Sequence, residues 1–317
     1  MRTITALFVG LGSIGTRHLK NLANLCADRG WTLQADALRS DLTRPLRPGA
    51  AELLHAQYTD LTAAPAHYDM VFITNPTSLH AEALRQVKGR GEALFIEKPI
   101  FSAEQTGLAL DELLPAGQKA YVAAPMRWCG AMLALKDRLP ALHPYCARVI
   151  CSSYLPDWRP GVDYRTVYSA RKALGGGVTI DLIHEWDYLV ELFGVPEKLY
   201  NFKGTYSELE IDSDDLSVYI AKYPTLLAEV HLDYFGRGYR RSIELFCRDG
   251  SYLADFGKGT LTLPDGTVQH YEEDVNRRYE REMEYFVDYA LTGCGESCNP
   301  PALALKVLKL TLGENVQ

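Results

Sequence analysis

The sequence has no stretch of about 20 apolar residues of the kind that crosses a membrane, and its first residues form no cationic leader followed by a long apolar run. It also lacks an excess of positive charge, because 33 Lys and Arg residues against 40 Asp and Glu residues give a formal net charge of -7. Binding to nucleic acid or to an anionic membrane needs clustered cations that displace counterions from phosphates, so we expect neither partner. The sequence predicts a cytoplasmic protein.

Cysteine is scarce and scattered, with seven residues in 317. An odd, dispersed set indicates free thiols in a chain long enough to be stable without disulfides. Only Cys294 and Cys298 form a suggestive pair, and they lack two further ligands at zinc-site spacing. We expect a surface loop there and no metal site.

The chain shows no internal repeat and no low-complexity linker. Its 317 residues exceed the roughly 250 to 300 at which a single core stops growing, so we expect two closely joined domains. A hydrophobic fraction of 47% is typical of a globular protein with sizeable cores. We place the boundary between residues 1–125 and 126–317.

Short apolar runs alternate with helical patterns throughout residues 1–125. Such alternation predicts a doubly wound α/β domain, in which helices cover both faces of a parallel sheet. The expected strands are Thr3–Val9, Leu33–Leu38, Met70–Thr74, Ala93–Ile96 and Lys119–Ala123, with helices that end near Cys26 and Lys88 and another that begins at Ser102.

The pattern changes after Arg127, where strands follow one another without intervening helices. This order predicts an α+β domain with a largely antiparallel open sheet. The two C-terminal helices belong to this domain in the prediction, with packing against the first domain as an alternative. The expected strands are Cys146–Tyr154, Asp215–Ile220, Leu226–Tyr234, Arg240–Cys247, Tyr252–Phe256, Thr260–Leu263 and Thr267–Tyr271, and the expected helices are 130–142, Val178–Phe193, Val275–Leu291 and Pro301–Leu312.

A glycine-rich turn follows the first expected strand, with Gly10, Gly12 and Gly15 around Ser13 and Ile14. Glycines at this spacing permit a tight turn and let the backbone approach a pyrophosphate at a helix N-terminus. The pattern alone also fits a structural turn, but its place between a strand and a helix at the start of a βαβ unit predicts a Rossmann-type dinucleotide site.

The end of the second expected strand carries Arg39 and Ser40, where NAD-preferring proteins usually place an acidic residue. An arginine beside a hydroxyl suits the additional phosphate of NADP. We therefore expect NADP, with NAD as the alternative if the strand ends elsewhere, and with Ser40 as a simple helix cap in that case.

Two further segments follow parallel strands, where ligands bind in open α/β sheets: Asn75-Pro76 with His80, and Glu97-Lys98-Pro99. With these motifs the chain resembles, over essentially its whole length, the family of glucose-fructose oxidoreductase, inositol dehydrogenase and rhizopine catabolism proteins (Gfo/Idh/MocA). The resemblance implies that Lys98 lies near the nicotinamide and the reacting hydroxyl, where an ammonium stabilises a developing alkoxide. Without the resemblance, Lys98 reads as a solvated surface lysine.

A second family signature runs from Gly175-Gly176-Gly177 to His184. Asp181 and His184 are three residues apart and are expected on one face of a continuous helix. The resemblance implies that His184 is the acid/base, and that Asp181 binds or orients the substrate. Histidine suits proton transfer because its ordinary pKa of about 6.5 makes both proton states accessible. The alternative for His184 is a partly buried structural histidine.

The long segment between the two signatures is rich in aromatic and arginine side chains. Such groups fit a sugar ring with a carboxylate or phosphate, so we expect an anionic or nucleotide-linked sugar. An arm that packs on a neighbouring subunit is the alternative, since the resemblance implies a homodimer or homotetramer formed through the C-terminal sheet. The candidate substrate residues are Arg127, Trp158, Arg159, Tyr164, Arg165, Tyr168, Asp181 and His184.

The resemblance implies an NAD(P)-dependent sugar dehydrogenase or reductase. Two alternatives differ in class: a non-catalytic sensor that binds NADP, which the fold permits, and a glycosidase that oxidises and re-reduces its sugar in each turnover. The presence of both Lys98 and His184 disfavours the sensor. Reduced cofactor accumulates during turnover of a dehydrogenase, whereas it returns to the oxidised form in each turnover of the glycosidase.

Overall fold

The structure, a computed structural model, describes residues 1–316. They form two compact units, the first from Met1–Ala124 with Tyr279–Leu305 and the second from Pro125–Arg278 with the residues from Lys306 onward. The first contains a parallel sheet and the second a largely antiparallel one, which confirms the predicted fold class. In the part of the chain that the structure describes, no helix has the length and apolar character needed to cross a membrane.

The first unit contains six parallel strands in the order β3-β2-β1-β4-β5-β6. The strand order reverses between β1 and β4, and ligands of open α/β sheets bind beside the carboxyl ends of the strands at such a switch point. The strands are β1 (Thr3–Val9), β2 (Thr32–Leu38), β3 (Leu54–Tyr58), β4 (Tyr68–Ile73), β5 (Gly91–Ile96) and β6 (Lys119–Val122).

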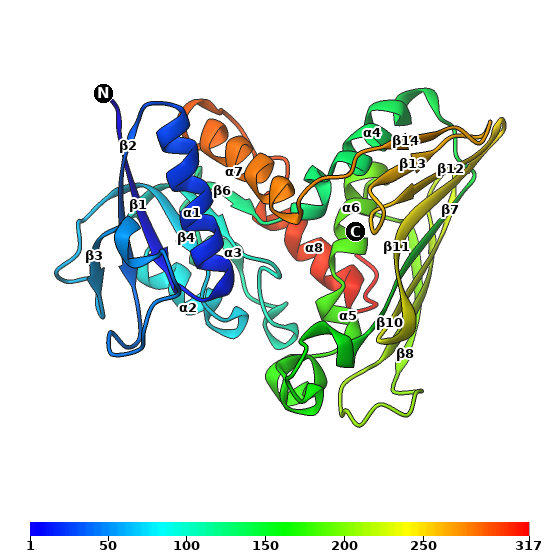
Figure 1. Ribbon diagram of the computed structural model, residues 1–317, viewed down its shortest axis with the longest axis horizontal. Coiled ribbons are helices and arrows are strands. Elements are labelled where there is room, and N and C mark those ends of the chain that lie inside the picture. The colour runs from blue at the N-terminus through cyan, green and yellow to red at the C-terminus, as the bar shows by residue number, and fades with distance from the viewer. Residues whose placement is uncertain (317) are drawn as a thin grey trace. The chain divides into compact units, whose positions relative to one another are not determined.

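Helices α1 (Ser13–Asp28) and α7 (Val275–Thr292) contribute to the core on one face of this sheet (Figure 1). The ring of Phe286 in α7 lies 5.4 Å from the ring of Phe72 and 5.1 Å from that of Phe95. Helix α7 therefore belongs to the same core as strands from the first half of the chain. The unit also contains α2 (His80–Gln86) and the short α3 (Leu110–Leu113).

Segments near the C-terminus also satisfy backbone groups of the first unit. Glu282 accepts hydrogen bonds from the Tyr121 hydroxyl (2.8 Å) and from the backbone N–H of Ala124 (2.6 Å). Asn299 exchanges two bonds with Val122, since its carbonyl accepts at 2.9 Å and its side-chain amide donates at 2.9 Å. These bonds fix the residues after α7 along β6.

The second unit contains eight strands in the order β14-β13-β12-β11-β7-β10-β9-β8, in which only β7 and β10 pair in parallel. Its strands are β7 (Cys146–Tyr154), β8 (Lys198–Gly204), β9 (Leu216–Lys222), β10 (Leu227–Asp233), β11 (Phe235–Cys247), β12 (Gly250–Asp255), β13 (Thr260–Thr262) and β14 (Val268–His270). Its helices are α4 (Gly130–Arg138), α5 (Val178–Asp181) and α6 (His184–Phe193), and α8 (Pro301–Thr311) belongs to it from Lys306.

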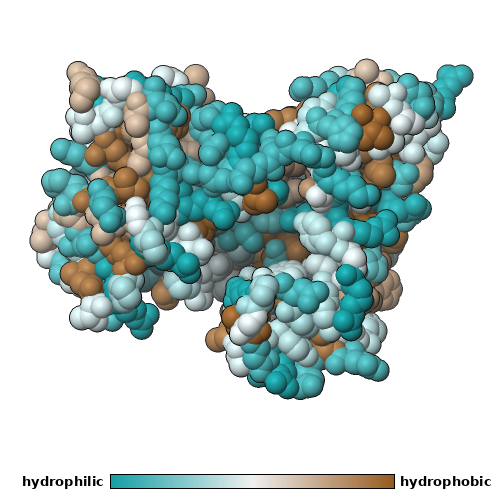
Figure 2. Space-filling model, viewed as in Figure 1, coloured by the Kyte–Doolittle hydropathy of each residue, from teal (hydrophilic) through white to brown (hydrophobic). Residues whose placement is uncertain are grey.

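Helix α6 packs on one face of this sheet (Figure 1). Trp186 lies 5.2 Å from the ring of Tyr219, and Tyr188 lies 5.4 Å from the ring of Phe256. The Tyr219 hydroxyl also donates to the Thr311 carbonyl at 2.6 Å, which ties α8 to the same face. The surface visible in Figure 2 is mainly hydrophilic with scattered hydrophobic residues.

Three local predictions differ from the structure. The continuous helix over Val178–Phe193 is wrong, because Leu182 and Ile183 separate α5 from α6. At the break the backbone makes three-residue bonds, from the Ile183 N–H to the Ile180 carbonyl at 3.3 Å and from the Glu185 N–H to the Leu182 carbonyl at 3.4 Å. Asp214 accepts hydrogen bonds from the backbone N–H of Thr179 at 2.9 Å and from its hydroxyl, and so caps the start of the short α5. The expected helix from Ser102 is only a single turn, and strands β3 and β8 were not predicted.

Candidate active site

The glycine-rich turn has the geometry that a bound pyrophosphate requires. Gly10 has a φ of +89°, and a Cβ there would lie 2.8 Å from Cα of Asn75. A Cβ on Gly15 would lie 2.6 Å from the Gly10 carbonyl oxygen, whereas one on Gly12 would meet only open space. Ser13 and Ile14 begin α1 directly after this turn. The Gly10 N–H donates to the Leu38 carbonyl at 3.0 Å, whereas Gly12 and Ser13 are exposed at the N-terminus of α1, a position where phosphates can bind.

Asn75, Pro76 and His80 lie beyond β4, beside the glycine turn. Asn75 is half-buried and Pro76 is exposed, but His80 is fully buried, with Nε2 3.1 Å from the Asn75 carbonyl and Nδ1 3.1 Å from the Ile100 carbonyl. Burial lowers the pKa of His80, although the hydrogen bonds to the Ile100 and Asn75 carbonyls oppose this shift. His80 therefore supports the segment at Asn75 from inside the protein.

Lys98 is half-buried at the carboxyl end of β5, and its backbone is held by Glu97. Glu97 is buried, with Oε1 2.6 Å from Nε2 of His18 and Oε2 accepting the Lys98 N–H at 3.0 Å. Burial raises the pKa of Glu97, but the hydrogen bond and charge of His18 and the charge of Lys98 outweigh it, so the pKa lies below its usual range. Glu97 thus couples α1 to the segment that carries Lys98.

Sequence reasoning missed His18. It lies on α1, three residues after Gly15, among apolar neighbours such as Leu19 and Leu22, and it is fully buried. The sequence does contain a signal for this buried histidine, because His18 lies on the apolar face of the helix that follows the glycine turn. Its Nδ1 has no hydrogen-bond partner among residues 1–316.

Arg39 follows directly after β2, as predicted from the strand pattern. Its guanidinium donates to Oε1 of Gln57 at 2.7 Å and to the Arg44 carbonyl. Asp36, the acidic residue within β2, is buried and accepts the Tyr68 hydroxyl at 2.8 Å, so it is not presented at the strand end. A cavity of about 430 Å³ next to Arg39 and Ser40 is lined by Arg39, Leu42, Thr43, Arg44, Pro45, Leu46, Arg47, Pro48, Gly49, Ala51, Glu52 and Gln57.

The second unit presents Asp181 at the end of α5 and His184 at the start of α6. They do not share one continuous helix face, because the break at Leu182 and Ile183 separates them. His184 is half-buried, whereas Asp181 is buried. Each carboxylate oxygen of Asp181 accepts a tyrosine hydroxyl, one from Tyr168 and one from Tyr234, the latter at 2.5 Å.

The three glycines before α5 permit close contacts within the second unit. A Cβ on Gly176 would lie 2.0 Å from the Tyr168 carbonyl oxygen. Gly177 has a φ of +132°, and a Cβ there would lie 2.3 Å from Oδ1 of Asp214. The glycine run therefore allows the Tyr168 backbone and the Asp214 side chain to pack against the entry to α5.

The long segment before the glycines brings its aromatic side chains toward Asp181. Trp158 donates from Nε1 to the Ser153 hydroxyl at 3.1 Å, and its ring lies 5.2 Å from that of Tyr234. The guanidinium of Arg159 lies 5.8 Å from the ring centre of Tyr168. In the described part of the chain, Arg159 makes no ion pair.

Tyr164 and Arg165 are engaged elsewhere. Arg165 pairs with Asp163 at 2.9 Å and with Glu210 at 2.9 Å, and both carboxylates raise its pKa. The Tyr164 hydroxyl accepts the Glu210 N–H at 3.2 Å. The structure therefore favours Arg159 over Arg165 as a contact for an anionic group.

Arg127 does not fit its predicted role as a substrate contact. Its side chain is only 3% exposed, and it donates to Asp187 at 2.9 and 2.8 Å and to Glu191 at 2.6 Å. A buried guanidinium that pairs with two carboxylates is a structural cation. Its partners on α6 were not evident from the sequence because they lie 60 or more residues away.

Another buried pair links α6 to β11. Arg241 donates to Glu185 through Nε at 2.7 Å and through Nη2 at 3.0 Å, and the Glu185 side chain is fully buried. Because Glu185 follows His184 directly, this pair anchors the first turn of α6.

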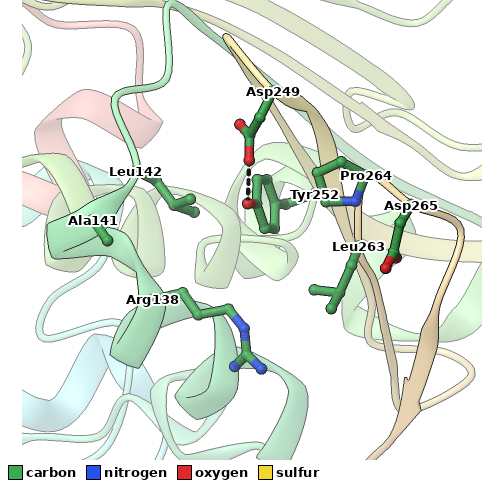
Figure 3. A pocket seen from close by; sticks show the side chains of 8 residues that line it. All are labelled: Arg138, Ala141, Leu142, Asp249, Tyr252, Leu263, Pro264 and Asp265. Atoms are coloured by element: carbon green, nitrogen blue, oxygen red, sulfur yellow. Dashed lines mark hydrogen bonds between the residues drawn. The ribbon is translucent and has the colours of Figure 1, made fainter.

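A cavity of about 590 Å³ in the second unit contains none of the predicted site residues (Figure 3). Arg138 lies on one side of it, while Tyr252 donates to Asp249 at 2.7 Å on the other. It is lined by Arg138, Ala141, Leu142, Asp249, Tyr252, Leu263, Pro264 and Asp265. Cavity size therefore does not identify the site.

Residues 4–123 match the protein family described as the Gfo/Idh/MocA oxidoreductase family with an NAD-binding Rossmann fold. The chain is 24% identical over 308 residues to the uncharacterized oxidoreductase YrbE of Bacillus subtilis, covering 90% of this chain and 86% of YrbE.

Two solved structures share its fold. One is UDP-N-acetylglucosamine 3-dehydrogenase GnnA from Acidithiobacillus ferrooxidans, with a TM-score of 0.72 at 18% identity, over 99% of this chain and 97% of that one. The other is levoglucosan dehydrogenase in complex with NADH and levoglucosan, with a TM-score of 0.81 at 15% identity, over 98% of this chain and 96% of that one.

Proposed function

Because residues 4–123 match the Gfo/Idh/MocA family of NAD-binding oxidoreductases, we propose that this chain transfers hydride between a nicotinamide cofactor and a secondary alcohol of a sugar or sugar derivative. The observation that carries the proposal is the glycine turn between β1 and α1, beside Asn75 at the point where the strand order reverses. The nicotinamide, when bound, accepts or returns the hydride.

The proton is handled by side chains of this protein. When the alcohol is oxidised, its C–H bond breaks as hydride leaves, and its hydroxyl proton passes to a ring nitrogen of His184. The ammonium of Lys98 stabilises the negative charge that develops on the oxygen. The Lys98 backbone N–H donates a hydrogen bond to the Glu97 carboxylate, and this bond supports the role by fixing the segment that carries the ammonium.

We propose NADP as the preferred cofactor. The cavity beside Arg39 is lined by three arginines and a single glutamate, Glu52, and the acidic Asp36 is buried within β2. Guanidinium groups bind a phosphate through charge-assisted hydrogen bonds, so this composition supports recognition of the 2′-phosphate.

Arg39→Ala is expected to weaken NADPH binding about tenfold or more, because a hydrogen bond to a charged group contributes roughly 1.5 to 3 kcal/mol. NADH binding is expected to be almost unchanged. Nicotinamide fluorescence titration of both cofactors measures the difference, and Arg85→Ala, at an exposed arginine of α2, is the control. Equal loss of affinity for NADH and NADPH would contradict the NADP preference.

We propose an anionic or nucleotide-linked sugar as substrate. The aromatic rings of Trp158 and Tyr168 suit a sugar ring, and Arg159, which makes no ion pair within residues 1–316, suits a carboxylate or phosphate. The likeness to a UDP-N-acetylglucosamine dehydrogenase supports the nucleotide-linked class, and the likeness to a levoglucosan dehydrogenase supports a sugar alcohol as the reacting group.

The test is to follow nicotinamide absorbance while the purified protein is offered NADP or NAD with free, acidic and nucleotide-linked sugars. Sustained reduction that is lost in Lys98→Ala and His184→Ala supports the dehydrogenase. Reduction that never accumulates while sugar is consumed supports the glycosidase cycle instead. Cofactor binding without any change in sugar or absorbance supports the sensor.

We also propose that the protein forms a homodimer or homotetramer through the face of the C-terminal sheet opposite α6. Alternate residues of β8, β9 and β10 leave apolar side chains exposed there, while Leu199, Ala221 and Ala228 between them are buried. Contiguous exposed apolar surface marks interaction sites. The exposed residues are Tyr200, Phe202, Ile220 and Leu227.

Phe202→Lys is expected to shift the protein toward monomers, because Phe202 is 75% exposed on β8 and a charge in a desolvated interface is costly. Light scattering coupled to size-exclusion chromatography measures the mass. Leu79→Lys, at an exposed leucine of the first unit, is the matched control. A wild-type protein that is monomeric at micromolar concentration would refute this interface.

A further inference from the structure

We propose that the hydroxyl oxygen of Tyr168 accepts a hydrogen bond from a hydroxyl group of the sugar, and that Asp181 is a positioning residue that acts through Tyr168. This inference rests on the proposed function. It deepens that function by giving Asp181 an indirect role and by assigning a substrate contact to the segment before the glycine run.

The carboxylate of Asp181 is already fully engaged within the protein. One oxygen accepts the Tyr168 hydroxyl and the other accepts the Tyr234 hydroxyl. Asp181 is 7% exposed and Tyr234 is fully buried, whereas Tyr168 is 43% exposed. Of these three residues, Tyr168 is the one that reaches the surface, although its phenol group is itself packed against Asp181.

The direction of the hydrogen bond determines what Tyr168 can offer. An ionised carboxylate only accepts, so the phenol proton points at Asp181. The phenol oxygen has two lone pairs, and the Ser169 hydroxyl is a donor for one of them, so one acceptor position remains for a substrate. Burial and the charge of Asp181 raise the pKa of Tyr168, which keeps the phenol protonated near neutral pH. The complementary group on a substrate is therefore a donor, such as a sugar hydroxyl.

The backbone around Tyr168 is held in place before any substrate arrives. The Tyr168 carbonyl lies against Gly176, where any Cβ would clash. The Ser213 hydroxyl donates to the Ser169 carbonyl at 2.7 Å, and the Asp212 N–H donates to the Ala170 carbonyl at 3.1 Å. A contact that is positioned in advance requires little ordering on binding, which fits a substrate residue better than a free arm.

The side chains beside Tyr168 extend the same surface. Arg159 lies over the Tyr168 ring, and Trp158 lies edge-on to the Tyr234 ring. The positions of both side chains therefore depend on the two tyrosines that hydrogen-bond to Asp181. Removal of the Asp181 carboxylate would release both tyrosines together. Asp181 therefore controls several groups although its own oxygens are covered.

The kinetic test uses whichever of UDP-N-acetylglucosamine and levoglucosan the enzyme oxidises faster. Tyr168→Phe is expected to raise KM about tenfold while kcat changes less than threefold, because it removes one hydrogen-bonding oxygen and keeps the ring. Tyr252→Phe, at a tyrosine that also donates to a carboxylate but lines the cavity of Figure 3, is the matched control. An unchanged KM in Tyr168→Phe would overturn the inference.

Two comparisons test the positioning role of Asp181: a double variant with Tyr168, and the conservative variant Asp181→Asn against Asp181→Ala. Asp181→Asn retains an accepting oxygen and is expected to impair kcat/KM less than Asp181→Ala does. The double variant Tyr168→Phe with Asp181→Asn is expected to resemble the worse single variant, because residues that act as a unit are not additive. Fully additive losses, or a loss of kcat in Asp181→Asn with an unchanged KM, would show that Asp181 acts on the reaction directly.

A substrate-free measurement separates this inference from the proposed function. Tryptic cleavage after Arg165, Arg171 and Lys172 is expected to accelerate in Asp181→Ala and to stay at the wild-type rate in Tyr252→Phe. Unchanged cleavage in Asp181→Ala would overturn the anchoring. If wild-type protein reduces no cofactor with any of the free, acidic and nucleotide-linked sugars, the proposed function fails and the substrate contact of Tyr168 fails with it, whereas the cleavage rates still test the anchoring by Asp181.

Discussion

Replacing His184 with alanine is expected to lower kcat by about 10² to 10⁴-fold, the usual contribution of a general acid or base. His184 is half-buried at the start of α6, and its ring would take the hydroxyl proton as hydride leaves the neighbouring carbon. Steady-state rates of nicotinamide reduction measure the loss, and fluorescence titration is expected to show unchanged cofactor affinity.

His143→Ala is the matched control for this variant, because His143 is an exposed histidine of the same unit. It is expected to retain wild-type rates. If His184→Ala kept its rate within about threefold, well below the effect of a general base, the proton would have to leave by another route. The assignment of His184 from its resemblance to the family would then be wrong.

Replacing Arg241 with methionine is expected to destabilise the protein by about 3 to 5 kcal/mol, because it leaves the Glu185 carboxylate buried without its cation. Glu185 has no exposed side-chain surface, and both of its oxygens accept from Arg241. Urea denaturation followed by fluorescence measures the change in the free energy of unfolding.

Two companion variants test the cause. Arg148→Met breaks an exposed pair with Glu229 and is expected to cost at most about 1 kcal/mol. Adding Glu185→Leu to Arg241→Met is expected to recover much of the lost stability, because a buried ion pair replaced by apolar groups is often neutral. Failure to recover would indicate that Arg241 contributes mainly through packing.

Patterns among neighbouring residues predicted the features that depend on neighbouring residues alone. The bounds of β1 and β7 agree with the expected strands, and Gly10, Gly12 and Gly15 lie at the predicted turn. Each depends on neighbours in sequence, through side-chain alternation or through a backbone that only glycine tolerates.

Features set by distant residues were not predictable in the same way. The hydroxyls that bond to Asp181 come from two tyrosines in separate segments, and buried Arg127 pairs with Asp187, 60 residues away. The parallel pairing of β7 with β10 likewise joins strands about 80 residues apart, in a region where consecutive strands suggested antiparallel neighbours. Propensity along the chain contains no signal for these long-range contacts.

The first unit is completed by residues that a ribosome makes only after most of the second unit. Until Glu282, Phe286 and Asn299 have emerged, Tyr121 lacks its hydrogen-bond acceptor, Val122 lacks its amide partners, and the Phe72 and Phe95 rings lack the helix that covers them. Domains usually fold from the N-terminus onward during synthesis. Here the nascent parallel sheet remains partly uncovered on the face shared by α1 and α7 while about 150 residues of the other unit are translated.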